Sequence, residues 1–108
     1  MAYDEELADR VRVLLADEEG LTERKMFGGL AFMVNGNMAC GIVEDELMLR
    51  LGAEGAEAAL NHPHVREMDF TGRPLTGMVY VGHGGLGDSE LRDWVTRATA
   101  YARSLPAK

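Results

Sequence analysis

The sequence predicts a single α+β domain, with an antiparallel sheet flanked by helices in two layers. Three observations predict this fold. The two ends of the chain have the apolar spacing of amphipathic helices, the middle has short apolar or alternating runs separated by tight turns, and the length of 108 residues suits one core. The expected order is a helix, three or four strands, a short helix, one or two strands and a closing helix, so residues 1–108 form one domain.

The first helix is expected over residues 3–18. Its apolar residues Leu7, Val11, Leu14 and Leu15 recur at the spacing of one helical face. Acidic residues at its start favour the positive end of the helix dipole, and a glycine offers a left-handed stop after its last turn.

Three strands are predicted to follow in a meander. The apolar run Leu30–Val34 leads into Asn35-Gly36, a pair that tolerates the positive φ of a type I′ hairpin turn. Residues 37–43 then pair back. After a second reversal, residues 47–51 alternate leucine with other side chains, which predicts leucines on the core face.

The second half of the chain is expected to be less regular. Residues 53–60 are rich in Ala and Glu and predict a short helix that ends before Pro63. Residues 61–77 read as an irregular loop with one short strand at 65–69, and residues 78–81 predict another strand.

A closing helix is predicted up to Leu105. Asp88 or Ser89 is expected to cap its first turn. Its apolar stripe consists of Leu91, Trp94, Val95, Ala98, Tyr101, Ala102 and Leu105.

Composition and charge restrict the possible partners and the compartment. The net charge is −7, which disfavours direct nucleic-acid binding because that affinity depends on Lys and Arg. The single Cys40 allows no intrachain disulfide, and the first residues do not resemble a signal peptide. No apolar run approaches the roughly 20 residues that span a bilayer. We therefore expect a cytoplasmic protein without membrane contact.

The segment Gly82–Gly87 matches the G-x-G-x-x-G fingerprint and lies between a predicted strand and a predicted helix. A dinucleotide site also needs a second strand after that helix, and the sequence has none there. A connecting loop is the simpler interpretation, and anion binding at the helix start stays an open alternative.

The residues that could bind a metal or act as a nucleophile are few. His62, His64, His83 and Cys40 are the only soft ligands, and the spacing of the histidines does not indicate a metal site. Cys40 lies in an apolar strand, where a thiol is normally inert. We expect no catalytic residues, no metal, no cofactor and no enzymatic activity.

Seven methionines are many for this length, and they indicate either an adaptable core or a plastic surface that binds partners. The most distinctive segment is 24–32, where a double glycine interrupts an apparent strand. That glycine pair predicts either a bulge or a groove for a partner or ligand. The candidate surface, including a possible local basic patch, comprises Arg24, Lys25, Phe27, Gly28, Gly29 and Arg73.

These features together resemble the N-terminal domain of the TfoX (Sxy) competence-regulator family. The resemblance rests on the Arg-Lys-Met-Phe-Gly-Gly block at 24–29, the hairpin at 35–38, the strand at 47–51 with Gly52, the segment 74–81 and the last helix with Trp94. It covers nearly the whole chain.

The resemblance implies a sheet flanked by helices, similar to type III secretion chaperones, and a regulatory role linked to genes of DNA uptake. It supplies no catalytic residue and no cofactor. The full regulators continue into a second, mostly helical domain that this sequence lacks, so a stand-alone form is expected.

The leading hypothesis is a non-enzymatic protein-interaction module whose partner is another protein or a second copy of the chain. The alternatives are a sensor of small ligands that uses a pocket beside Gly28-Gly29, and a transcriptional regulator associated with nucleic acid.

Overall fold

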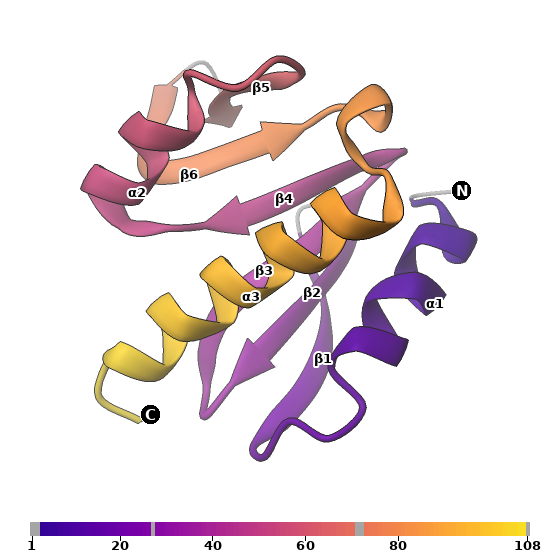
Figure 1. Ribbon diagram of the computed structural model, residues 1–108. Helices are drawn as coiled ribbons and strands as arrows, with labels where there is room; N and C mark the ends of the chain where they lie inside the picture. The colour runs from indigo at the N-terminus through magenta and orange to yellow at the C-terminus, as the bar shows by residue number, and fades with distance from the viewer. Residues whose placement is uncertain (1–2, 27, 71–72, 108) are drawn as a thin grey trace.

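The computed structural model describes residues 3–26, 28–70 and 73–107, with the backbone alone at 26, 69–70 and 73–75. Three α-helices, six strands and one short 3₁₀ helix occur within these ranges (Figure 1). In chain order they are α1 (Glu5–Leu14), β1 (Leu21–Met26), β2 (Gly29–Val34), β3 (Asn37–Val43), β4 (Glu46–Arg50), α2 (Gly52–Ala59), β5 (Val65–Phe70), β6 (Arg73–Val81), η1 (His83–Gly85) and α3 (Asp88–Ser104).

The six strands form one open antiparallel sheet in the order β1-β2-β3-β4-β6-β5. Helices α1 and α3 cross the same face of this sheet, and α2 packs beside β6 (Figure 1). The α+β class, the layers and the order of elements predicted from the sequence are confirmed. No helix in the described ranges is long and apolar enough to cross a membrane.

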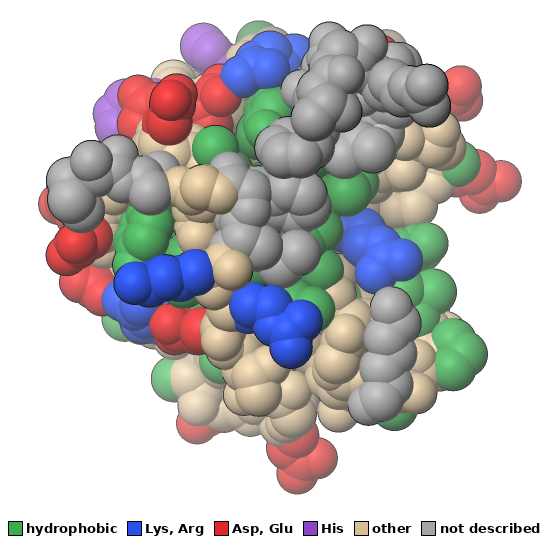
Figure 2. Space-filling view, turned by 180° about the vertical axis from the view of Figure 1, so that it is seen from behind, with side chains coloured by type: hydrophobic (Ala, Val, Ile, Leu, Met, Phe, Trp, Pro, Cys, Tyr) green, Lys and Arg blue, Asp and Glu red, His purple; other side chains and the backbone are tan. Residues whose placement is uncertain are grey.

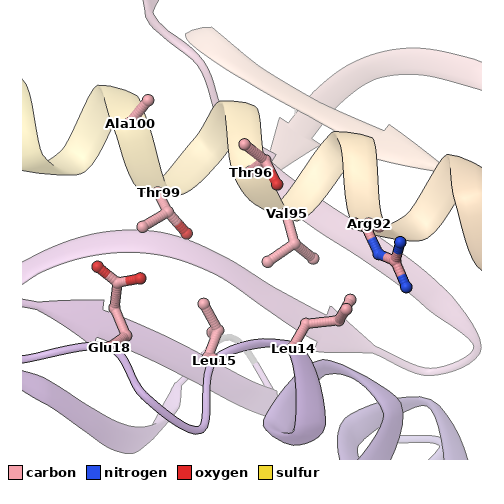
Figure 3. A pocket seen from close by; sticks show the side chains of 8 residues that line it. All are labelled: Leu14, Leu15, Glu18, Arg92, Val95, Thr96, Thr99 and Ala100. Atoms are coloured by element: carbon pink, nitrogen blue, oxygen red, sulfur yellow. The ribbon is translucent and has the colours of Figure 1, made fainter.

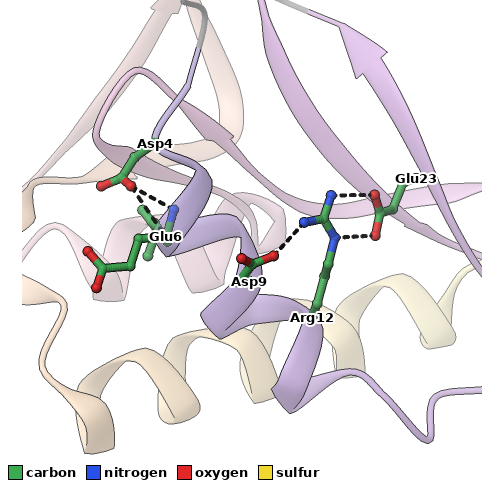
Figure 4. Close-up of polar contacts among 6 residues, drawn as sticks. Asp4, Glu6, Asp9, Arg12 and Glu23 are labelled. Carbon is green, nitrogen blue, oxygen red and sulfur yellow. Dashed lines mark hydrogen bonds and ion pairs between the residues drawn. The ribbon is translucent and has the colours of Figure 1, made fainter.

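Helix α1 is fixed at its start and along its exposed side by polar contacts (Figure 4). The Asp4 carboxylate accepts hydrogen bonds from the backbone N–H groups of Glu6 and Leu7, at 3.0 and 3.2 Å. The Arg12 guanidinium donates two hydrogen bonds to Glu23 on β1, at 2.8 and 2.9 Å, and one to Asp9. These bonds connect α1 to the edge strand, and the helix ends at Leu14, earlier than predicted.

The double glycine separates two strands, so the interpretation of one bulged strand was wrong. Strands β1 and β2 pair as a hairpin, with Met26 opposite Gly29. Gly28 has a φ of 75° in the turn, a conformation that glycine adopts at little cost. The bulge lies farther along, where the β2–β3 register shifts between Phe32 and Met33.

The predicted turn at Asn35-Gly36 is confirmed, since both residues have positive φ values, 53° and 83°. The leucines of β4 point to the helix-covered face, as their alternation predicted.

The second half is more regular than expected. Strand β6 begins at Arg73, inside the segment predicted to be a loop, because residues 73–79 extend the hairpin with β5. The cap of α3 is Gly87, so the prediction of Asp88 or Ser89 was wrong. Asp88 instead accepts a hydrogen bond and ion pair from Arg10 at 3.1 Å.

We call the helix-covered side of the sheet the inner face. Leu30, Phe32 and Val34 of β2 pack there against the buried stripe of α3, which includes Trp94 and Ala98. Together with other aliphatic residues of α1, β3, β4 and β6, they form the main hydrophobic core.

We call the opposite side the outer face. It has its own hydrophobic cluster, formed by Ala31, Met38, Met48, Met68 and Tyr80 with the partly buried Met33, Val43 and Met78. Gly41 lies opposite Met48, and a Cβ at this glycine would be 2.7 Å from the Met48 methyl carbon. The methionine side chain therefore lies across β3 where only hydrogen leaves room for it.

Candidate functional site

The candidate cations on β1 point to opposite faces of the sheet. Arg24 is opposite Ala31 in the β1–β2 register and shares the outer face with it, since directly paired residues point the same way. Lys25 is opposite Leu30, an inner-face residue. Both side chains are exposed, but strand alternation prevents them from forming one continuous contact surface.

The remaining predicted residues are only partly brought together. Gly28 and Gly29 belong to the same hairpin as Arg24. Gly29 lies so close to β3 that a Cβ would clash with the Ile42 carbonyl oxygen, which gives a structural reason for glycine there. Arg73 begins β6, and three strands separate β6 from β1. Phe27 and the side chain of Arg73 lie outside the described residues.

Arg66 adds a cation to the outer face that sequence reasoning missed. It is opposite Tyr80 in the β5–β6 register, and its guanidinium carbon is 4.5 Å from the centre of the Tyr80 ring. It also forms an ion pair with Glu46 of β4. The pairing of β5 with β6 brings these side chains together, and the order of residues along the chain gave no sign of it.

The outer face thus combines exposed arginines with methionines. Met38, Met48 and Met68 are buried, which agrees with the interpretation of methionine as adaptable core filling, whereas Met33 and Met78 are partly exposed. In Figure 2, Lys and Arg side chains reach over the middle of this side of the molecule, next to hydrophobic ones. Most of the acidic side chains visible there lie toward its rim.

A second candidate region lies where residues 61–64 meet the first turns of α3 and the segment Gly82–Gly87, which we call the glycine-rich loop. His62, His64, Glu90 and Asp93 line a cavity of about 320 Å³ there. The His62 ring contacts the Trp94 ring edge-on, with 5.1 Å between centroids. Among the described residues, no group of three or more His, Cys, Asp and Glu side chains is arranged to hold a metal ion.

The glycine-rich loop packs against His64. A Cβ at Gly84 would lie 2.6 Å from the His64 ring, and the N–H of Gly82 donates to the His64 carbonyl oxygen at 2.7 Å. The glycines therefore allow a close approach between two loops, which is a structural reason for the fingerprint match.

Cys40 lies in the middle of β3, and its side chain is fully buried in the inner core. Burial raises the pKa of its thiol to about 12, and no charged group among the described residues contributes to that shift. The thiolate is the reactive form of cysteine, so this environment suppresses nucleophilic chemistry.

A comparison with known families gives a match over most of the chain. The family model described as the TfoX N-terminal domain matches residues 13–102, which include every described strand and α2, and most of α3. No curated protein and no solved structure matches the chain.

Proposed function

Because the chain belongs to the TfoX N-terminal domain family, we propose that it is a non-enzymatic regulatory module that acts by binding another protein through the outer face of its sheet. The proposed role is regulatory, like that of the competence regulators of this family. The proposed compartment is the cytoplasm, where Cys40 stays reduced.

The observation that carries this proposal is the contrast between the outer face and the whole chain. The formal net charge is −7, yet the outer face presents the exposed Arg24 on β1, for which the described residues show no ion pair. Arg66 lies on β5 at the opposite edge of the sheet, where its charge is paired with Glu46 and 56% of its side chain is exposed. An unpaired cation such as Arg24 on the surface of an acidic protein selects for partners by charge.

The methionines supply the apolar part of the contact. Met33 and Met78 are partly exposed beside the buried outer cluster. Methionine has a flexible, polarisable side chain that adapts its shape to a partner surface. The proposed partner therefore presents apolar side chains bordered by Asp or Glu.

A second copy of the chain is a less favoured partner than another protein if the two outer faces pack directly against each other. Two outer faces packed directly together would bury the same unpaired cation, Arg24, from both copies in one interface, which opposes association. A second copy could still bind if its acidic helix surface packed against the outer face, because that surface would supply the negative charge that we expect of the partner.

The test uses two neighbouring charge reversals. Arg24→Glu changes the outer face, and Lys25→Glu makes the same change one residue along β1 on the opposite face. The wild type and both variants are immobilised, incubated with lysate of the source cell, and the retained proteins are identified by mass spectrometry. Light scattering of each purified chain measures self-association.

We expect a partner, or a dimer, that the wild type and Lys25→Glu retain and that Arg24→Glu loses. Equal retention by both variants would exclude the outer face as the contact surface. The absence of any retained protein, together with a monomer by light scattering, would contradict the interaction module itself.

A further inference from the structure

A cavity lies away from the outer face, between the end of α1 and the middle of α3 (Figure 3). Its volume is about 470 Å³, within the range of small-molecule sites in proteins. Neither the outer-face proposal nor the family match assigns a role to it.

The cavity has an apolar wall. Leu14 and Leu15 line it from the end of α1, and Val95 lines it from α3. In Figure 3 these three side chains point toward one another across the gap between the two segments. Such a wall favours the aliphatic part of a ligand, because burial removes its apolar surface from water.

Thr99 places an unsatisfied hydroxyl at this cavity. The residue is only 8% exposed, and its Oγ1 is a buried oxygen without a hydrogen-bond partner in the described part of the chain. A threonine on a helix commonly donates its hydroxyl to the carbonyl four residues earlier, and Thr99 does not do so. Its side chain points from α3 toward Leu15 and Glu18 (Figure 3), so a polar ligand atom in the cavity would satisfy it.

The two ends of the cavity differ in charge. Arg92 lies at one end, and the described residues provide it with no ion pair. Glu18 lies at the other end and is neutralised by an ion pair with Arg103. The available charge in the cavity is therefore the positive one of Arg92.

The separation of these groups restricts the shape of the ligand. Arg92 and Thr99 are seven residues apart on α3, which corresponds to roughly 10 Å along the helix axis. One small polar group cannot reach both. A ligand that satisfies both needs an anionic end, an aliphatic middle and a second oxygen.

We propose that this cavity binds a medium-chain aliphatic carboxylate that carries a hydroxyl or carbonyl oxygen along its chain. The carboxylate pairs with Arg92, the chain packs against Leu14, Leu15 and Val95, and the second oxygen accepts a hydrogen bond from Thr99.

The experiment measures binding of octanoate, ω-hydroxyoctanoate and octylamine by calorimetry, and locates the site by amide chemical shifts. We expect ω-hydroxyoctanoate to bind about fivefold more tightly than octanoate, which is the contribution of one neutral hydrogen bond. Octylamine should bind more weakly than both acids, because its charge opposes Arg92. Within a series of acids, each added methylene should tighten binding about fourfold until the cavity is filled.

Two variants separate the polar contacts. Thr99→Val keeps the shape of the side chain and should abolish the preference for the hydroxylated acid, while it raises thermal stability by removing an unsatisfied buried hydroxyl. Arg92→Gln should weaken both acids about fivefold. Arg97→Gln is the matched control on the same helix, because Arg97 pairs with Asp93, stacks on Trp94 and does not line the cavity.

Three results would overturn the proposal. The first is a complete absence of binding by either acid. The second is a hydroxyl preference that persists in Thr99→Val. The third is a set of shift changes that lies outside α3 and the end of α1.

Discussion

Both faces of the sheet contain fully buried side chains, but of different kinds. Phe32 on the inner face and Met48 on the outer face are both fully buried. The inner face uses branched and aromatic side chains that helices cover. The outer face uses small residues such as Gly41 and Ala31, with methionines lying across them.

This difference follows from the layer on each side. A helix layer supplies facing side chains, so rigid residues can interdigitate with them at close packing. A sheet face without such a layer must be shielded from water by its own side chains. Long, flexible methionine side chains do this by lying flat over small residues such as glycine. The same flexibility would let the outer face adapt its shape to the partner proposed above.

The largest expected effect tests whether the inner face depends on shape more than the outer face does. Phe32→Ala should lower the free energy of unfolding by about 4 kcal/mol, because α3 and the sheet hold the resulting cavity open. Met48→Ala should cost about 2 kcal/mol, since the neighbouring Met38 and Met78 can move into the space. Urea denaturation followed by circular dichroism measures both.

Met48→Leu and Phe32→Leu provide the controls for that pair. The first swap conserves volume and should cost less than about 1.5 kcal/mol, whereas the second replaces a planar ring and should cost more. Equal losses at the two positions would show that the outer face is packed as rigidly as the inner one.

Glycine gives the next largest contrast. Gly29→Ala should lower the free energy of unfolding by about 3 kcal/mol, because the added Cβ clashes with the backbone of Ile42, which cannot move alone. Gly28→Asn has open space around it and needs only a positive φ, so a cost below about 1 kcal/mol is expected. A Gly29→Ala variant as stable as Gly28→Asn would mean that β2 and β3 can separate at this edge.

The sequence predicted the fold where a local signal determines the structure. The Asn35-Gly36 turn, the alternation of β4 and the stripe of α3 each depend on neighbouring residues, and the first two are confirmed. The stripe is confirmed except at Tyr101, which is only partly buried, and at Leu105, which follows the end of the helix. The predictions were wrong at the start of α3 and where a distant strand decides the outcome. Asp88 does not cap α3 because the helix already begins at this residue, with the Leu91 N–H donating to the Gly87 carbonyl oxygen. The Asp88 carboxylate pairs with Arg10 from α1 instead. The apparent loop before Gly77 is a strand because β5 pairs with it.

The candidate surface was harder to predict for a related reason. Arg24 and Lys25 look like one basic pair in the sequence, but strand alternation separates them, which could have been anticipated once β1 was placed. Arg66 could not have been assigned, because its contact with Tyr80 depends on a register known only from the structure. Thr99 had a weak signal, since it is a polar residue within the apolar spacing of the last helix.

Substitutions at Cys40 test whether water is excluded from the core on the inner face. Cys40→Ser should lower the free energy of unfolding by about 2 kcal/mol, because it places a hydroxyl in apolar surroundings, whereas Cys40→Ala should cost about 1 kcal/mol. With its thiol pKa raised to about 12 by burial, the native protein should react with a thiol reagent only as fast as it opens. Rapid labelling under native conditions would indicate that β3 is open to solvent.

The smallest effect concerns how the helix layer is attached to the edge of the sheet. Hydrogen bonds from Arg12 lower the pKa of the Glu23 carboxyl below its ordinary value. Folding therefore favours the ionised form, so the stabilisation is complete above the unfolded-state pKa of about 4.3 and is lost as pH falls through the lower folded-state pKa. Glu23→Gln should cost about 0.5 kcal/mol at neutral pH, since the pair is partly exposed to solvent.

The difference in unfolding free energy between Glu23→Gln and the wild type should therefore shrink as the pH is lowered from about 4.3, in denaturation series at fixed ionic strength. Glu67→Gln is the matched control, because Glu67 is an exposed β5 carboxylate for which the described residues show no ion pair. A constant difference down to acid pH would mean that Arg12 does not discriminate between the charged and neutral forms of Glu23. In that case the charge of Glu23 would add nothing to the attachment of α1, which would depend on its apolar packing and on its other polar contacts, such as the Arg10–Asp88 ion pair.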